Sequence, residues 1–175
     1  MENVQLEKQA KLSEHYTLGE MTKTSTGMMN IPSRVSIENL KRVCGWLEAL
    51  RARYNLRYVS PSSDHPAHPG TPPNLGGEKD TEEPIVITSG YRSPEVNRKV
   101  GGSPTSNHLT GCAVDIRVYG IEQALRYAVI LMDYADETRQ DYDELLIERN
   151  RSGRYWVHFA VRPKENRRKT MIIQK

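Results

Sequence analysis

The sequence lacks the features of a membrane protein, an exported protein or a disulfide scaffold. No apolar run approaches the roughly 20 residues of a membrane-spanning helix. The opening residues, MENVQLEKQAKLSEHY, are polar and contain no apolar segment of a secretory signal. Cysteine is scarce, since Cys44 and Cys112 stand alone without a C-x-x-C pair. We interpret them as buried thiols of a reducing compartment, and a disulfide between them stays open.

A strong excess of one charge is also absent. The 175 residues carry a formal net charge of +3, which does not point to nucleic acid as a partner. With 37% apolar and 27% charged residues, the composition fits a globular protein and excludes a disordered one. The basic excess is local, because residues 162–175 hold six Lys or Arg against one Glu. We favour a solvated terminal strand there over a segment that attracts an anionic surface.

Hydrophobic periodicity predicts helices interleaved with short strands. In 36–54, apolar side chains recur at helical spacing, and Ser36 with Asn39 stands near the start, while Ser13 and Thr17 are candidate caps of earlier turns. The other predicted elements are a strand at 84–90, a helix at 93–102, a strand at 113–119, a helix at 121–134 and strands at 144–148 and 155–161. The last two strands are close enough for a hairpin. The fold class is therefore α+β, with a small, largely antiparallel sheet flanked by helices.

A long segment without periodicity interrupts these elements. Residues 59–84 hold six prolines and three glycines, which predicts a loop over 59–83. A loop of this length is either functional or disordered. It contains Asp64, His65 and His68, but the intervening prolines prevent a regular element from fixing them as metal ligands. We therefore interpret these three as polar loop side chains.

Two predicted strands carry charged residues where a buried side chain would be expected. In 113-AVDIRVY-119, Asp115 lies on the face opposite Val114 and Ile116, which belong to the core. In 155-YWVHFAV-161, His158 is likewise in mid-strand, away from the face of Phe159. With His108 on the preceding loop, two imidazoles and one carboxylate would leave a fourth tetrahedral position for water, as in catalytic zinc sites. Spacing alone is a weak signal for such a site.

Three motifs give this pattern a family resemblance. The segment 106-SNHLTGCAVD-115 resembles the S-x-H-x-x-G-x-A-x-D motif of the zinc D-Ala-D-Ala carboxypeptidase family, which includes phage and bacterial cell-wall endopeptidases. Downstream, 156-WVH-158 resembles its W-x-H motif, and upstream 89-SGYRS-93 resembles its S-G-Y-R-S segment. The resemblance covers residues 84–161 and, more loosely, 12–55. It implies the fold shared by hedgehog signalling domains and D-Ala-D-Ala peptidases.

The resemblance implies roles for individual residues. His108, Asp115 and His158 would bind zinc. Arg92 would neutralise a substrate carboxylate or the developing oxyanion, a task that suits a fixed guanidinium. Tyr91 would contact the substrate.

Three small or polar residues of the first motif also receive roles from the resemblance. Gly111 and Ala113 would be small because the chain passes close to the metal there. Ser106 would bond either to substrate or to its own loop, and the sequence does not separate these two roles.

The general base is where the sequence departs from the family. Many members have Glu or Asp three residues before the last histidine, but here that position is Tyr155. Glu148, at the end of the preceding strand, is our predicted base, because a hairpin would turn it into the cleft of His158. Glu144 and Asp143 are the next candidates.

The implied function is zinc-dependent hydrolysis of peptide bonds in peptidoglycan, as a D-Ala-D-Ala carboxypeptidase or an endolysin-type endopeptidase. The alternative is a catalytically inactive zinc-containing module that binds the cell wall. A serine hydrolase built on Ser106, His108 and Asp115 is rejected, because no G-x-S-x-G elbow occurs.

The chain is predicted to form one zinc peptidase domain over 1–175. Its core would span about 12–161, followed by a basic C-terminal segment at 162–175. We expect a monomer whose partners are peptidoglycan stem peptides or cross-bridges, with no nucleic acid and no membrane span. Without a visible signal, it would stay cytoplasmic until released to the cell wall, as phage or prophage lysis proteins are.

Overall fold

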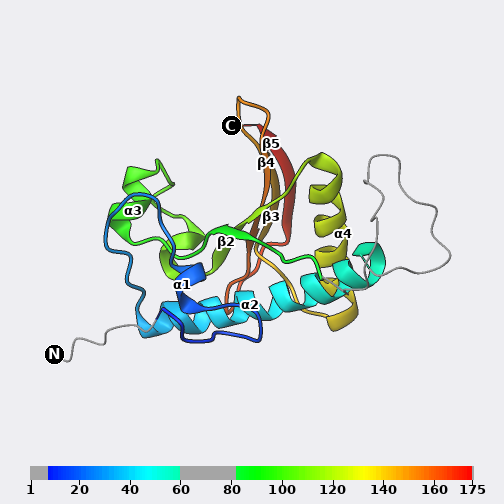
Figure 1. The fold of residues 1–175 in the computed structure, drawn as a ribbon, viewed down its shortest axis with the longest axis horizontal. Helices are drawn as coiled ribbons and strands as arrows, with labels where there is room; N and C mark the ends of the chain where they lie inside the picture. Colours follow the sequence, from blue (N-terminus) through cyan, green and yellow to red (C-terminus); the bar gives the residue numbers. More distant parts are fainter. Residues whose placement is uncertain (1–7, 60–81, 175) are drawn as a thin grey trace, which may run out of the picture.

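A five-stranded sheet organises the fold (Figure 1), which we describe from a computed structural model. The structure describes residues 8–59 and 82–174. The strand order is β1-β2-β4-β3-β5, antiparallel except for the parallel pair β3 and β5. The strands are β1 (Ile87–Ser89), β2 (Ala113–Arg117), β3 (Glu144–Arg149), β4 (Tyr155–Ala160) and β5 (Lys169–Gln174). The helices are α1 (Leu18–Met21), α2 (Arg34–Tyr54), α3 (Pro94–Lys99) and α4 (Ile121–Thr138), with a π-helical turn at Asn55–Val59 and a 3-10 turn at Asn107–Thr110.

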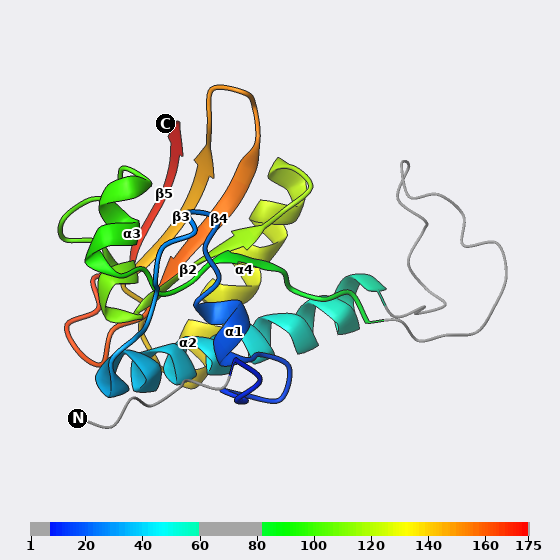
Figure 2. The same ribbon diagram turned by 60° about the vertical axis from the view of Figure 1, so that its left-hand side comes forward.

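One face of the sheet forms the hydrophobic core. In Figure 1, α4 lies on one side of strands β3–β5 and α3 on the other, and Figure 2 shows α2 running along the lower end of the sheet. Alternate residues of β2, β3 and β4 point toward α2 and α4 and are buried: Val114, Ile116, Leu145, Ile147, Val157 and Phe159. The predicted α+β fold, with a small sheet flanked by helices, is confirmed.

Helix α2 anchors the core, although it begins earlier than the sequence indicated. Its cap is Ser33, whose hydroxyl accepts a hydrogen bond from the backbone of Ser36, so Ser36 lies within the first turn. Trp46 packs against Phe159 with ring centroids 5.3 Å apart, which ties the helix to β4.

The N-terminal segment is held to α2 by polar contacts. Thr17 caps α1 as predicted, in a capping box with Glu20. Ser13 caps no helix and instead donates to Glu48 of α2 at 2.6 Å. The other oxygen of Glu48 lies 2.7 Å from Nδ1 of His15. Hydrogen bonds from Ser13 and His15 lower the pKa of Glu48, although burial opposes them.

The remaining elements follow the predictions with shifted ends. Helix α3 lies within the predicted range 93–102, with Ser93 as its cap and Pro94 in its first turn. Strand β1 is shorter than expected and α4 is four residues longer. The predicted terminal strand is β5, an edge strand beside β3. Both cysteines are free and buried.

Two further expectations from the sequence concern the proline-rich loop and membrane-spanning helices. Asp64, His65 and His68, with most of the predicted loop, lie outside the described residues. Within residues 8–59 and 82–174, no helix has the length and apolar character needed to cross a membrane.

Candidate metal centre and its cleft

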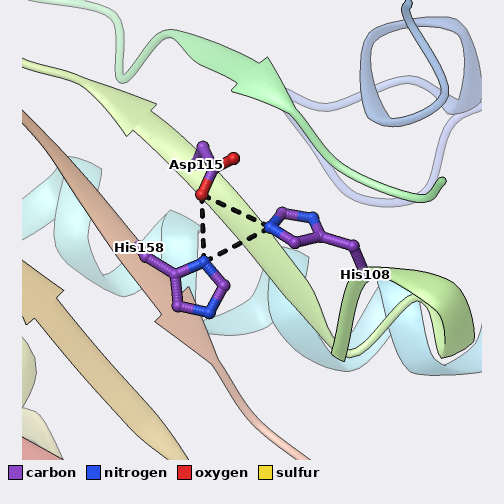
Figure 3. Close-up of side chains that lie close together, drawn as sticks. All are labelled: His108, Asp115 and His158. Atoms are coloured by element: carbon purple, nitrogen blue, oxygen red, sulfur yellow. Dashed lines mark hydrogen bonds and ion pairs between the residues drawn. The ribbon is translucent and has the colours of Figure 1, made fainter. Parts of the chain in front are cut away.

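The structure brings His108, Asp115 and His158 together on the face of the sheet away from the core (Figure 3). Asp115 of β2 and His158 of β4 are direct cross-strand partners, so their side chains leave the same face. His108 reaches them from the 3-10 turn before β2. Nε2 of His108 lies 3.3 Å from Nδ1 of His158 and 3.3 Å from Oδ1 of Asp115, and the latter two atoms are 3.0 Å apart.

These separations fit a tetrahedral metal ion. Ligand bonds of about 2.0–2.1 Å to zinc at tetrahedral angles put neighbouring donor atoms roughly 3.3 Å apart. The three donor atoms form a triangle of that size, and they are two nitrogens and a carboxylate oxygen, which zinc accepts. The predicted ligand set is therefore brought together in a geometry that could hold a metal ion.

In both imidazoles, the ring nitrogen that faces away from the cluster also has a nearby oxygen atom as a partner. Nδ1 of His108 lies 2.6 Å from the carbonyl oxygen of Gly90, so this nitrogen carries the proton and Nε2 keeps its lone pair toward the cluster. Nε2 of His158 lies 3.6 Å from Oε2 of Glu144, on the side of the ring away from the cluster. Such outer contacts orient metal-binding imidazoles and fix which nitrogen is free to bind.

The local backbone explains how His108 reaches the cluster. Ser106 caps the 3-10 turn by accepting from the backbone of His108. Gly111 ends the turn at φ 73°, and a Cβ there would lie 2.5 Å from the carbonyl oxygen of Ser36. Gly111 is therefore small because the turn packs on α2, which corrects the prediction that proximity to the metal requires it.

The members of the cluster have shifted pKa values. Burial lowers the pKa of His108. Burial acts on His158 in the same direction, but interactions with Asp115 and Glu144 outweigh it and raise the pKa of His158 to about 9. Burial would raise the pKa of Asp115, yet the two histidines hold it well below the usual range. The carboxylate thus stays charged between the rings, which suits a site for a cation.

Arg92 stands beside the cluster. Its Nη2 pairs with Oδ2 of Asp115, the oxygen that does not face the histidines, and its Nε donates to Ser89 at 2.8 Å. The two contacts fix the guanidinium plane at the edge of the site. Arg92 also lines the cleft above the cluster, where its remaining N–H groups can meet a ligand.

A cleft of about 750 Å³ opens over the cluster. Glu148 lines it and is only 3% exposed. In the β3–β4 register Leu146 is opposite His158 and Glu148 is opposite Trp156, so Glu148 is a diagonal neighbour of His158 on the same face. Diagonal neighbours have Cα atoms roughly 7–8 Å apart, which lets a glutamate reach a group bound between them.

The two other carboxylates considered as a base have different surroundings. Glu144 lines the cleft but is paired with Arg167 at 3.0 Å and Lys169 at 3.6 Å. His158 is the chief cause that lowers the pKa of Glu144 to about 2. Asp143 is fully buried, bound by Arg162 and Arg167, and is not among the residues that line the cleft.

Two residues predicted to contact substrate are placed differently. Ser106 lines the cleft, while its hydroxyl serves the cap of its own turn. Tyr91 is packed in the hydrophobic core at 7% exposure and does not line the cleft. The structure therefore corrects the prediction for Tyr91, whose side chain belongs to the hydrophobic core.

Sequence reasoning missed Asn107, Arg162 and Arg167, which also line the cleft. Asn107 lies inside the first motif, at a position where the motif specifies no residue. The arginines lie in the turns between β4 and β5, where no periodicity indicates a direction. Only the basic composition of 162–175 pointed to this segment.

Comparison with known proteins places this site in a family. Residues 77–143 match the family Peptidase M15. This match supports the resemblance of the chain to M15 peptidases. The matched residues include Arg92, His108 and Asp115, and they end before β3 and β4. His158 and Glu148 lie outside the match, and the pairing of β2, β3 and β4 brings these strands side by side. The fold and the cluster agree with an M15 peptidase, a metal-dependent hydrolase. Comparison with curated proteins found no match.

Proposed function

We propose that the protein is a zinc metallopeptidase that hydrolyses peptide bonds in peptidoglycan stem peptides or cross-bridges. The observation that carries this proposal is the triangle of His108, Asp115 and His158 donor atoms at tetrahedral spacing on the floor of a cleft. A structural zinc site closes all four positions with protein ligands, whereas three ligands below an open cleft suit a catalytic one. The M15 family supports the same chemistry.

The three ligands would hold the ion and leave it open to the cleft. A divalent ion there supplies Lewis acidity, which polarises a peptide carbonyl and lowers the pKa of water toward neutrality. The carbonyl of Gly90 and the carboxylate of Glu144 keep the two imidazoles in the orientation that binding needs.

Glu148 would accept the proton of the attacking water and deliver it to the leaving nitrogen. It lies on the face of the cluster and lines the cleft, next to His158 along the sheet. Glu144 is the weaker candidate, since Arg167, Lys169 and the outer nitrogen of His158 surround its carboxylate. A positioned base of this kind contributes roughly 10²–10⁴-fold to the rate.

Arg92 would stabilise the negative charge that develops on the carbonyl oxygen. Ser89 and Asp115 already orient its guanidinium, so it need not reorganise during the reaction. Fixed donors of this type commonly contribute about 10²–10³-fold.

The proposal is tested with zinc-loaded protein and purified peptidoglycan. Wild type should contain about one zinc per chain and release fragments whose masses identify the bond cut. Glu148→Gln should keep its zinc and lose about 10²–10⁴ of the rate. Glu122→Gln, which removes an exposed carboxylate in the first turn of α4, is the control and should match wild type.

The test also separates an enzyme from a binding module. If zinc-loaded wild type and Glu148→Gln both bind wall fragments and neither cleaves them, the protein is a zinc-containing cell-wall-binding module. If Glu148→Gln cleaves at the wild-type rate, the base is another residue, and Glu144→Gln is the next variant to measure.

A further inference from the structure

The cleft has two chemically different ends on either side of His158. In the β3–β4 pair, Glu144 is opposite Ala160 at one end and Glu148 is opposite Trp156 at the other. Arg162 and Arg167 line the cleft at the Glu144 end. None of the proposed catalytic steps uses these two arginines, so their place in the cleft requires another explanation.

The buried carboxylate of Asp143 holds the guanidinium groups of both Arg162 and Arg167 in place. Asp143 is fully buried and lies 3.0 Å from Nε of Arg162. The same carboxylate accepts two hydrogen bonds from Arg167, from Nε at 2.8 Å and from Nη2 at 2.7 Å. Asn107 adds an acceptor for Nε of Arg162 at 2.9 Å. The backs of both arginines are thus held, which reduces the entropy that binding a ligand would cost.

The contacts of Arg162 with Asn107 and Asp143 involve only its Nε. Among the residues that the structure describes, no hydrogen-bond acceptor meets its Nη1 or Nη2. The Arg162 side chain is 33% exposed and lines the cleft, so its two amino groups are available to a ligand there. A fork of parallel N–H groups matches the two oxygens of a carboxylate.

The charge at this end also favours an anion. Arg162, Arg167 and Lys169 supply three positive charges, and Asp143 with Glu144 supplies two negative ones. The balance is one positive charge, and the carboxylate of Asp143 is buried behind the arginines. A substrate carboxylate at this end of the cleft therefore meets guanidinium groups, while Glu144 is already paired with Arg167 and Lys169.

We propose that Arg162 and Arg167 form a subsite for a free carboxylate of the substrate peptide. This inference rests on the proposed function and narrows its substrate class. Glu144 is two residues along β3 from Leu146, the partner of His158, and two residues of strand span roughly 6.6–6.8 Å. An extended peptide has the same rise, so the carboxylate belongs to a residue within about two positions of the bond cut.

The test uses three synthetic stem peptides, L-Ala–γ-D-Glu–L-Lys–D-Ala–D-Ala with all carboxylates free, with the D-Glu α-carboxyl amidated, and with the C-terminus amidated. For zinc-loaded wild type, one of the two amidated peptides should have a KM at least tenfold higher than the peptide with free carboxylates. Arg162→Gln should raise KM for the free peptide by a similar factor and lose the discrimination between acid and amide. Arg162→Lys should recover part of the discrimination between acid and amide, because lysine keeps the positive charge but lacks the parallel N–H groups of the guanidinium.

The control is Arg154→Gln, an exposed arginine before β4 that does not line the cleft. It should keep wild-type KM values for all three peptides. Unchanged KM on both amidations in wild type overturns the subsite, as does full discrimination by a folded Arg162→Gln protein.

A different readout separates this subsite from the proposed function. If wild type hydrolyses none of the peptides, titration calorimetry with the same peptides still tests the subsite. The proposal then requires wild type to bind the free peptide at least tenfold more tightly than Arg162→Gln does. Equal affinities overturn it, whatever the protein hydrolyses.

Discussion

The two faces of the sheet are built from alternate residues of the same strands, yet they differ in every respect. Phe159 points to the core and packs on Trp46, while its neighbour His158 points to the cleft and meets Asp115. On the core face, energy comes from apolar area removed from water and is spread over many side chains. On the cleft face, a few polar groups converge. A single strand therefore serves stability and chemistry at adjacent positions.

The largest effect is expected on the cleft face. His158→Ala removes one of the three donors, so zinc content should fall to background and hydrolysis should drop by at least about 10³-fold, the several kcal/mol that a metal ion supplies. Metal analysis and peptide digestion measure this. The metal-free variant should unfold close to metal-free wild type. A zinc content equal to wild type would contradict the ligand assignment.

The next effect is expected one residue further along the strand. Phe159→Ala should lower the free energy of unfolding by about 3–5 kcal/mol, because it leaves a cavity against Trp46. Urea unfolding monitored by circular dichroism measures this loss. Phe159→Leu, which fills more of the space, should lose less. The folded fraction should hydrolyse peptides at the wild-type kcat. A large loss of kcat would contradict the assignment of stability to the core face and catalysis to the cleft face.

The smallest effect is expected at a polar cluster outside the cleft. Glu48→Gln should lower stability at neutral pH by about 1 kcal/mol, because the charged acceptor of Ser13 and His15 is lost. Since the pKa of Glu48 is lowered in the folded protein, wild type gains this stability above the unfolded-state pKa of about 4.3. It loses the gain as pH falls through the lower, folded-state value.

Thermal unfolding of both proteins from pH 7 to pH 3 checks this dependence. The difference between wild type and Glu48→Gln should shrink on acidification, and peptide hydrolysis at neutral pH should be equal. A difference that persists unchanged at pH 3 would show that packing, rather than charge, holds the N-terminal segment to α2.

The sequence predicted the two faces unequally well. Alternation in β2 and β4 assigned Phe159 to the core and Asp115 to the opposite face, because a two-residue period is a local property of the chain. The convergence of His108 with them came from the family motif, since spacing cannot show which strands are neighbours. The pairing of β2 with β4 supplies that information in the structure.

Other features depend on contacts that no local pattern reports. Arg162 and Arg167 lie in turns, and their direction is set by the buried carboxylate of Asp143. Tyr91 was assigned to the substrate from its motif, but it packs in the hydrophobic core together with Met21. Glu144 shares the face of Glu148 by alternation, but the alternation does not report that Glu144 forms ion pairs with Lys169 of β5 and with Arg167 of the preceding turn.

The donor triangle joins a turn to two strands, at positions 108, 115 and 158 of the chain. An ion seated there would tie together segments up to 50 residues apart, since His108 and His158 are separated by that distance in sequence. Occupancy would thus act as a reversible cross-link, adding RT ln(1 + [metal]/Kd) to the resistance against unfolding. The melting temperature should accordingly rise with the concentration of free zinc. A chelator would therefore lower the melting temperature of the domain as well as abolish hydrolysis.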